Sequence, residues 1–474
     1  MTRNRVMPRR YLREAFMVHE RSFESLRALY RDGGLSPVAV TASSLEHAEA
    51  VNGRLNAFAL IDAERAIGAA RASEKRWREG KPLSDIDGMP VAIKDGAALE
   101  GWPSRKGSVV TSAAPVNESA AVVTRLIAAG AVLIGKTRMP EFAWKGVTDS
   151  PGYGITRNPL NPELTPGGSS GGCAAIVAAG VVRVSIGSDA AGSIRIPAAF
   201  TGIFGLKPTF GRVPITPPAS AFFNVAHYGP MASSVSDLAS VMDVISGPSA
   251  RDWTSVGLAP ADFKSQASPS ELRIGLLNPL RWDESVDVIK RAMDQTYGIL
   301  WSNGFNMRTV DFDVHHASRT GAFLYRLGCL AAVNSVPNEQ HKQLDPWLLK
   351  FVEPARHATV EDIQRAALQR DKLGAQFCAL FDEIDVLILP TTPILPFEAG
   401  RNVPAGATDD DWFSWNPYTP AFNLTQAPAM SVPFWPEGSE LPVGIQLVTA
   451  KCGEDVLLRL ASWLEQHLPR RQAT

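Results

Sequence analysis

LTPGGSSGGCAAIVAAGVVRVSIGSDAAGSIRIP, residues 164–197, is the most informative stretch of this 474-residue chain. Two clusters that contain glycine and serine, 167–172 and 192–193, flank a run of small apolar residues and a short strand pattern. Glycine allows backbone conformations that other residues resist, and small residues let backbone approach backbone or ligand closely. A small-residue loop that leads into a helix also presents free backbone N–H groups to an anion. The stretch therefore predicts an anion-stabilising loop that carries serine hydroxyls.

Helix and strand patterns alternate outward from this stretch. A helix pattern is followed by a strand pattern four times, at 120–129 and 131–134, 173–179 and 181–186, 284–303 and 305–310, and 360–383 and 385–389. Such alternation predicts an α/β fold with a mainly parallel sheet. Residues 1–85 have helical spacing. Two short strands are expected late in the chain, within 423–433 and 441–448.

The composition excludes several classes of protein. A hydrophobic content of 45% and a charged content of 20% are typical of a globular protein with a large core. The net charge of −1 gives no electrostatic reason to expect nucleic acid or a membrane surface as a partner. No apolar run approaches the roughly 18–20 residues that span a bilayer, and the basic N-terminus lacks the apolar core of a secretory signal. We therefore expect a cytoplasmic protein, and an exposed helix rather than a transit peptide at the N-terminus.

Cysteine and histidine give no sign of a metal site. The four cysteines are dispersed without C-x-x-C spacing, which argues against zinc and against a disulfide framework. Histidine forms one pair, His315 and His316, without further ligands nearby in the sequence. We expect free thiols, no metal and no cofactor.

A lysine is the candidate partner for the serines. Lys94 ends the strand pattern Val-Ala-Ile within DGMPVAIKDG, residues 87–96. Such a strand is usually buried, so Lys94 is either a surface residue that leaves the sheet or a buried amine with a function. The GGSSG run matches a nucleophile elbow, but the preceding NPELTP is not a strand. A serine nucleophile activated by a neutral lysine remains, and burial or a nearby positive charge can lower the pKa of a lysine enough.

Several motifs together resemble the amidase signature family. GMPVAIKD, PGGSSGG and GSDAAGSIRIPA occur in the family's order, with 75 residues from Lys94 to Ser169 and 24 from Ser169 to Ser193. The resemblance continues through FGLKPTFGRVP, DVLILPTTP, NLTQAPAMSVP and LPVGIQLV. It implies one α/β domain over 1–474, with a mixed central sheet of many strands covered by helices on both faces. Its expected parts are an N-terminal helical segment (1–85), a catalytic core (86–246), a surface connection (247–270), and the rest of the sheet with a pocket cover (271–474).

The resemblance implies a Ser–cis-Ser–Lys triad. Ser193 would be the nucleophile that forms an acyl-enzyme. Ser169, preceded by a cis peptide bond in this family, would bridge the nucleophile and the lysine. Lys94 would be the base, and the alternatives Lys136 and Lys145 lie in no matching motif.

The residues around the nucleophile would form the oxyanion hole. The resemblance assigns this role to the backbone N–H groups of Ala190, Ala191, Gly192 and Ser193. Ala191 stands where the family commonly has glycine, and an alanine at positive φ would be strained. We expect the backbone at Ala191 to avoid that region.

Other residues would support the site. Asp189 and Arg195 would fix the nucleophile loop, although a plain buried ion pair predicts nearly the same arrangement. Ser170 would support the lysine. The substrate pocket would be lined by Phe142, Ala143, Trp144 and Tyr153, with Trp144 equally explained as a core aromatic residue.

Three functions compete at this stage. The first is an amidase that hydrolyses a small aryl or alkyl carboxamide to an acid and ammonia or an amine. It would need no nucleic acid or membrane partner, and its form could be a homodimer. The second is the glutaminase subunit of a tRNA-dependent amidotransferase, whose characteristic Ser/Thr-Glu-Asn and Tyr-Tyr-x-Ala-Tyr runs are absent from 144–150 and 323–328. The third is a non-catalytic small-molecule-binding protein, which leaves Lys94 and the paired serines unexplained.

Overall fold

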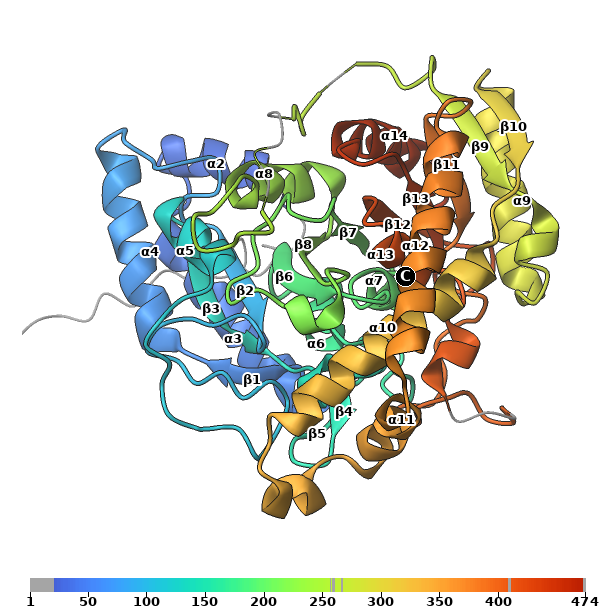
Figure 1. Cartoon of the computed structure of the whole chain (residues 1–474). Coiled ribbons are helices and arrows are strands. Elements are labelled where there is room, and N and C mark those ends of the chain that lie inside the picture. Colours follow the sequence, from blue (N-terminus) through green and yellow to red (C-terminus); the bar gives the residue numbers. More distant parts are fainter. Residues whose placement is uncertain (1–20, 256, 258–260, 266, 408–410, 472–474) are drawn as a thin grey trace, which may run out of the picture.

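Strands from both halves of the chain meet in one sheet. The computed structural model describes residues 21–471, except 256, 258–260, 266 and 408–410. Among these residues, eleven strands form a sheet in the order β1-β3-β2-β6-β8-β7-β12-β13-β11-β9-β10 (Figure 1). The strands are β1 Phe58–Ile61, β2 Pro90–Lys94, β3 Val132–Thr137, β6 Val184–Asp189, β7 Phe204–Lys207, β8 His227–Ala232, β9 Arg273–Leu277, β10 Asn306–Val310, β11 Val386–Pro390, β12 Ala429–Phe434 and β13 Val443–Val448. A separate hairpin consists of β4 Asp149–Ser150 and β5 Gly154–Ile155.

The sheet is mixed, as the family resemblance implies, but the expectation of a mainly parallel sheet is wrong. Strands β3, β2 and β6 run parallel on one side, and β11, β9 and β10 run parallel on the other. The middle of the sheet, from β6 through β8, β7, β12 and β13 to β11, is antiparallel. Antiparallel neighbours can be joined without a crossover helix, so the helix–strand alternation gives no signal for these pairings.

Helices flank the sheet (Figure 1). They are α2 Phe23–Arg31, α3 Pro37–Leu55, α4 Ala63–Arg78, α5 Ala121–Ala128, α6 Gly171–Ala178, α7 Arg195–Thr201, α8 Val235–Ile245, α9 Asp287–Ser302, α10 Val314–Asn334, α11 Pro346–Arg356, α12 Val360–Leu380, α13 Pro420–Leu424 and α14 Glu454–His467. Capping residues in the sequence determine where several of these helices begin. The side chain of Ser36 caps α3, whose first residue is Pro37, and Thr359 forms a capping box with Asp362 at α12. None of the described helices combines the length and apolar composition needed to cross a membrane.

The N-terminal region contains a strand that helical spacing does not reveal. Asn56 ends α3 in the left-handed conformation, and β1 then pairs antiparallel with β3 before α4 begins. The helix expected at the extreme N-terminus falls within residues 1–20, outside the described residues. Between α8 and β9 the described part of 247–270 holds neither helix nor strand. Further along, α10 is followed by a 3₁₀ segment, Asn338–Gln343, and then by α11.

The parallel pairing of β2 with β6 determines where the site forms. Because parallel strands end at the same edge of a sheet, Lys94 at the end of β2 and Asp189 at the end of β6 lie at one edge. The loops that precede α6 and α7 carry the two serine motifs to this edge. Glycine allows the close packing there, since a Cβ on Gly187 of β6 would lie 2.9 Å from Ser170 Oγ.

Candidate active site

Lys94 is fully buried among serine hydroxyls. Its Nζ atom lies 2.6 Å from Ser169 Oγ, 2.9 Å from Ser170 Oγ and 3.0 Å from Ser188 Oγ. The sequence analysis missed Ser188, whose only signal is its place one residue before Asp189 in a strand. The structure therefore adds a third hydroxyl to the two expected around the lysine.

The hydrogen bonds of Ser170 restrict the direction of this network. Its hydroxyl donates to the Ser188 carbonyl at 3.1 Å and accepts from the Ser188 N–H at 3.2 Å. Because its single proton is already used, Ser170 can only accept from Lys94. An uncharged lysine has two N–H donors and one lone pair. With one donor directed to Ser170, the second donor and the lone pair are left for Ser169 and Ser188, whose hydroxyls can each accept or donate.

Burial favours the uncharged form of Lys94. Desolvation lowers the pKa of this amine to about 7, against the weaker opposing effects of Cys173 and Asp189. The other two candidate lysines have carboxylate partners. Lys136 Nζ lies 3.1 Å from Asp95, and Lys145 Nζ lies 2.6 Å from Asp149. Of the three candidate lysines, Lys94 is the one that forms no salt bridge within the described part of the chain, so it is the best suited of the three to accept a proton.

The loop that carries Ser169 is held by close backbone packing. The peptide bond between Gly168 and Ser169 is cis. A Cβ on Gly168 would lie 2.4 Å from the Val147 carbonyl oxygen, so this position requires glycine. Thr148 Oγ1 accepts from the Gly171 N–H at 3.0 Å and joins this loop to the segment before β4.

Ser193 lies in the second loop, next to the first. Its carbonyl accepts from the Ser170 N–H at 3.1 Å, so the two serine-containing loops meet directly. Ser193 is 4% exposed, and its hydroxyl makes no hydrogen bond with any residue that the structure describes. Gly192 before it has a φ of 117°, and a Cβ there would lie 2.1 Å from Thr419 Oγ1. The loop that carries Ser193, the expected nucleophile, is called the nucleophile loop, and it depends on glycine at this position.

The backbone amides of 190–193 differ in availability. The Gly192 N–H donates to Asp189 Oδ1 at 2.7 Å, so it is not free for a substrate. The other three amides remain the proposed oxyanion donors. Ala191 is not among the residues with positive φ, so alanine causes no strain in this loop.

Two side chains from the C-terminal part of the chain hold this loop. Asn416 Nδ2 donates to the Ala191 carbonyl at 2.9 Å, and Thr419 Oγ1 lies 2.8 Å from the same oxygen. The sequence analysis missed both, because they lie 225 and 228 residues further along the chain.

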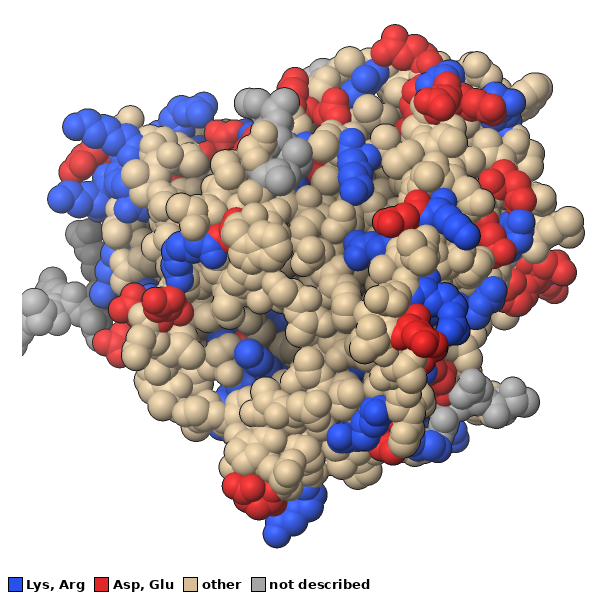
Figure 2. Space-filling view, viewed as in Figure 1, with Lys and Arg blue, Asp and Glu red and all other residues tan. Residues whose placement is uncertain are grey.

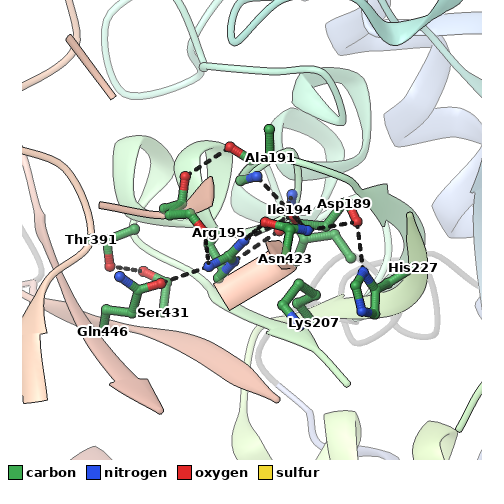
Figure 3. A network of polar contacts seen from close by, with 12 residues as sticks. Asp189, Ala191, Ile194, Arg195, Lys207, His227, Thr391, Asn423, Ser431 and Gln446 are labelled. Carbon is green, nitrogen blue, oxygen red and sulfur yellow. Dashed lines mark hydrogen bonds and ion pairs between the residues drawn. The ribbon is translucent and has the colours of Figure 1, made fainter. Parts of the chain in front are cut away.

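Asp189 and Arg195 form a buried, paired network behind the loop (Figure 3). Arg195 donates through Nε and Nη2 to the two carboxylate oxygens of Asp189, each at 2.9 Å. It also donates to Gln446 Oε1 at 2.8 Å and to Asn423 Oδ1 at 2.5 Å. Burial alone would raise the pKa of Asp189, but the charge and hydrogen bonds of Arg195 hold it well below its usual range. Arg195 therefore links the nucleophile loop to β13 through Gln446 and to α13 through Asn423.

The expected pocket residues separate into two groups. Phe142 and Ala143 adopt positive φ values of 49° and 62°, and Tyr325 Oη donates to the Ala143 carbonyl at 2.6 Å. Trp144 is buried in an apolar cluster that also contains Ala191. This cluster therefore extends from the residues expected to line the pocket to the loop that carries Ser193.

Tyr153 contacts a different set of residues. Its ring lies under the guanidinium groups of Arg105 and Arg138, and its hydroxyl donates to the Ser108 carbonyl at 3.3 Å. None of the contacts found for Tyr153 among the described residues reaches the Trp144 cluster. The two parts of the expected pocket thus differ in character, one apolar and one basic.

Comparisons with known proteins agree with this geometry. A family model described as Amidase matches residues 39–458. The chain is 32% identical to the glutamyl-tRNA(Gln) amidotransferase A subunit of Chloroflexus aggregans, over 90% of this chain and 92% of the relative. It is 33% identical to a putative amidase AmiB2 of Mycobacterium bovis, over 92% and 94% of the two chains.

Solved structures share the whole fold. One comes from a vestigial protein complex that reveals the evolutionary origins of an s-triazine catabolic enzyme. It has a TM-score of 0.88 and 29% sequence identity, and the match covers 96% of this chain and 100% of the other. A bacterial aryl acylamidase of the amidase signature family has a TM-score of 0.85 and 27% identity, over 94% and 96% of the two chains.

Proposed function

The chain belongs to the Amidase family, whose members cleave amide bonds, and on that basis we propose that it hydrolyses a carboxamide through an acyl-enzyme on Ser193. The observation that carries this proposal is the buried Lys94 amine, surrounded by hydroxyls and without a carboxylate partner among the described residues. A lysine in this state is a base, and an adjacent base is what a serine nucleophile needs.

The reaction proceeds in two halves. Ser193 Oγ attacks the amide carbonyl carbon while its proton passes to Ser169 Oγ, whose own proton passes to Lys94 Nζ. The same path returns a proton to the leaving nitrogen as the C–N bond breaks, because an amine leaves poorly without one. Water then attacks the acyl-enzyme with the same relay, and the acid is released as Ser193 regains its proton.

Backbone amides stabilise the charge that develops on the carbonyl oxygen. The N–H groups of Ala190, Ala191 and Ser193 are the proposed donors, since that of Gly192 is bound to Asp189. Losing one such donor typically costs about 10²–10³ in rate. Asn416 and Thr419 set the orientation of these peptides through the Ala191 carbonyl.

Two substrates are candidates. The apolar cluster that contains Trp144 and reaches Ala191 favours a small amide with an aryl or alkyl acyl group. The second candidate is glutamine, with ammonia passed on within a tRNA-dependent amidotransferase. The extent of the similarity to amidotransferase A subunits favours this second candidate, with identities of 31–34% over at least 90% of the chain for the relatives from Chloroflexus and Thermus.

Ammonia release across a panel of amides tests the proposal. The panel contains short aliphatic amides, aryl amides, peptide C-terminal amides and glutamine, and glutamine is also tested with amidotransferase partner subunits. Wild-type turnover that falls by roughly 10⁴-fold or more in Ser193→Ala is expected. Turnover that survives this substitution would contradict the assignment of the nucleophile. Glutamine turnover that requires the partner subunits would select the second candidate.

A further inference from the structure

Two arginines share one tyrosine ring beside the catalytic edge of the sheet. The Arg138 guanidinium carbon lies 5.2 Å from the centroid of the Tyr153 ring, and that of Arg105 lies 5.8 Å from it. Lys106 follows Arg105 in the same loop and is exposed. Positive charge is therefore concentrated around a single aromatic side chain.

Apart from the Tyr153 ring, the Arg138 guanidinium has no hydrogen-bonding or salt-bridge partner within the described residues. Its Nε atom is buried and makes no hydrogen bond, and no salt bridge involves this side chain. Desolvation lowers the pKa of Arg138, so burial of its charge is unfavourable. Arg138 is half-buried, whereas the buried Arg195 and Arg183 are paired with the carboxylates of Asp189 and Asp237. Arg138 differs from them in lacking an anion.

The nearby carboxylate is already engaged. Asp95 attracts Arg138, but its Oδ1 atom lies 3.1 Å from Lys136 Nζ and accepts from the Arg105 N–H at 3.2 Å. Its Oδ2 atom accepts from the Gly107 N–H at 3.0 Å. Arg105 itself donates only to neutral oxygens, the Thr111 hydroxyl and the Val109 carbonyl. Neither guanidinium therefore has a carboxylate of its own among the described residues.

The basic group adjoins the catalytic residues. Arg138 directly follows Thr137, which is the register partner of Lys94 in the adjacent strand. A Cβ on Gly172 in the first turn of α6 would lie 2.6 Å from the Arg138 carbonyl oxygen, so the two backbones are in contact. Figure 2 shows a hollow near the centre of this face, beside the loop that follows β2, with Lys or Arg side chains in it.

We infer that Arg138, assisted by Arg105, binds a carboxylate on the substrate, so that the enzyme acts on amides that also carry an anionic group. This inference rests on the proposed function and narrows its substrate class. A carboxylate would give the Arg138 guanidinium the anionic acceptor that it lacks, and arginine suits this role because its planar N–H groups match a carboxylate bidentately. Monoamides of short dicarboxylic acids and α-amino acid amides such as glutamine both meet this requirement.

Matched pairs of amides test the inference. Succinamate is compared with butyramide, and glutaramate with pentanamide, so that each pair differs mainly in the carboxylate. We expect kcat/KM at least tenfold higher for the carboxylate member, mostly through KM. In Arg138→Gln this preference should fall by about tenfold to a hundredfold, the range for one charged hydrogen-bonding group, and Arg138→Lys should retain part of it. Arg105→Gln should reduce it less.

Arg65 provides a matched control. Its guanidinium also lies over an aromatic ring, 5.5 Å from the centroid of Trp102, but on α4. Arg65→Gln should leave the preference unchanged. A preference that survives in Arg138→Gln, or a wild type that turns over the neutral member equally well, would overturn the inference.

Binding to Ser193→Ala separates this inference from the proposed function. Calorimetry with succinamate and butyramide needs no turnover. If the wild type hydrolyses no amide and Ser193→Ala still binds succinamate more tightly than butyramide through Arg138, the anion site stands and the proposed function fails. If amides are hydrolysed but succinamate has no advantage in rate or binding, the proposed function stands and the anion site is refuted.

Discussion

Lys94 and Lys136 lie on neighbouring strands and are both almost completely buried, with 0% and 1% exposure, yet their surroundings differ. Lys94 contacts three serine hydroxyls. Lys136 contacts the Asp95 carboxylate at 3.1 Å and the Pro103 carbonyl at 2.9 Å. Burial lowers the pKa of both amines, but Asp95 opposes the shift at Lys136. The two lysines thus differ in their partners and not in their burial. The partners of Lys94 suit the proposed proton transfer, whereas those of Lys136 hold two strands and a loop together.

Replacing Lys94 should have the largest effect, and the effect should be on activity. Lys94→Met removes the proposed base and should lower kcat by about 10²–10⁴-fold, the usual contribution of a general base. Stability should be retained or rise, because a buried amine without a counter-charge is replaced by an apolar side chain of similar length. Amide turnover and thermal unfolding of the same preparation measure both. Near-normal turnover in a folded variant would show that Lys94 is not the base.

Replacing Lys136 should reverse this pattern. Lys136→Met leaves Asp95 buried and without its main charge partner, which should cost about 3–5 kcal/mol of unfolding free energy. The urea midpoint measures this loss. Adding Asp95→Asn removes the unpaired charge and should recover part of the loss. If Lys136→Met lost turnover as Lys94→Met does while its unfolding free energy stayed the same, the distinction between the two lysines would be wrong.

Replacing Ser188 should have a small effect. Ser188→Ala deletes one acceptor of the Lys94 amine but leaves Ser169 and Ser170 in place. One hydrogen bond is worth about 0.5–1.5 kcal/mol, so kcat should change by about two- to tenfold. A loss as great as that in Lys94→Met would mean that the proton path includes Ser188.

The proposed catalytic residues could be singled out in the sequence because each lies in a local motif. Lys94, Ser169 and Ser193 each lie in a short run with a recognisable pattern, and the glycines at 168 and 192 mark positions where a side chain would collide with backbone or with Thr419. That these runs meet is a property of the sheet, in which β2 and β6 are neighbours.

The features that could not be predicted depend on contacts between distant parts of the chain. Asn416 and Thr419 reach the nucleophile loop from more than 220 residues away, and nothing in their own segment indicates this role. Strand β1 has four residues between two helices, too few for its period to stand out. The basic group around Tyr153 likewise combines the loop after β2 with residues that follow β3 and β4.

The most direct test of the account is the rate at which a fluorophosphonate labels Ser193 as a function of pH, in the wild type and in Lys94→Met. The pKa of Lys94, about 7, lies below its ordinary value, so the amine gains its proton only as the pH falls through about 7. We predict that wild-type labelling falls below this pH as the base becomes protonated, and that labelling of Lys94→Met is slow at every pH. Equally fast labelling of Ser193 in Lys94→Met, with the same dependence on pH, would contradict the account.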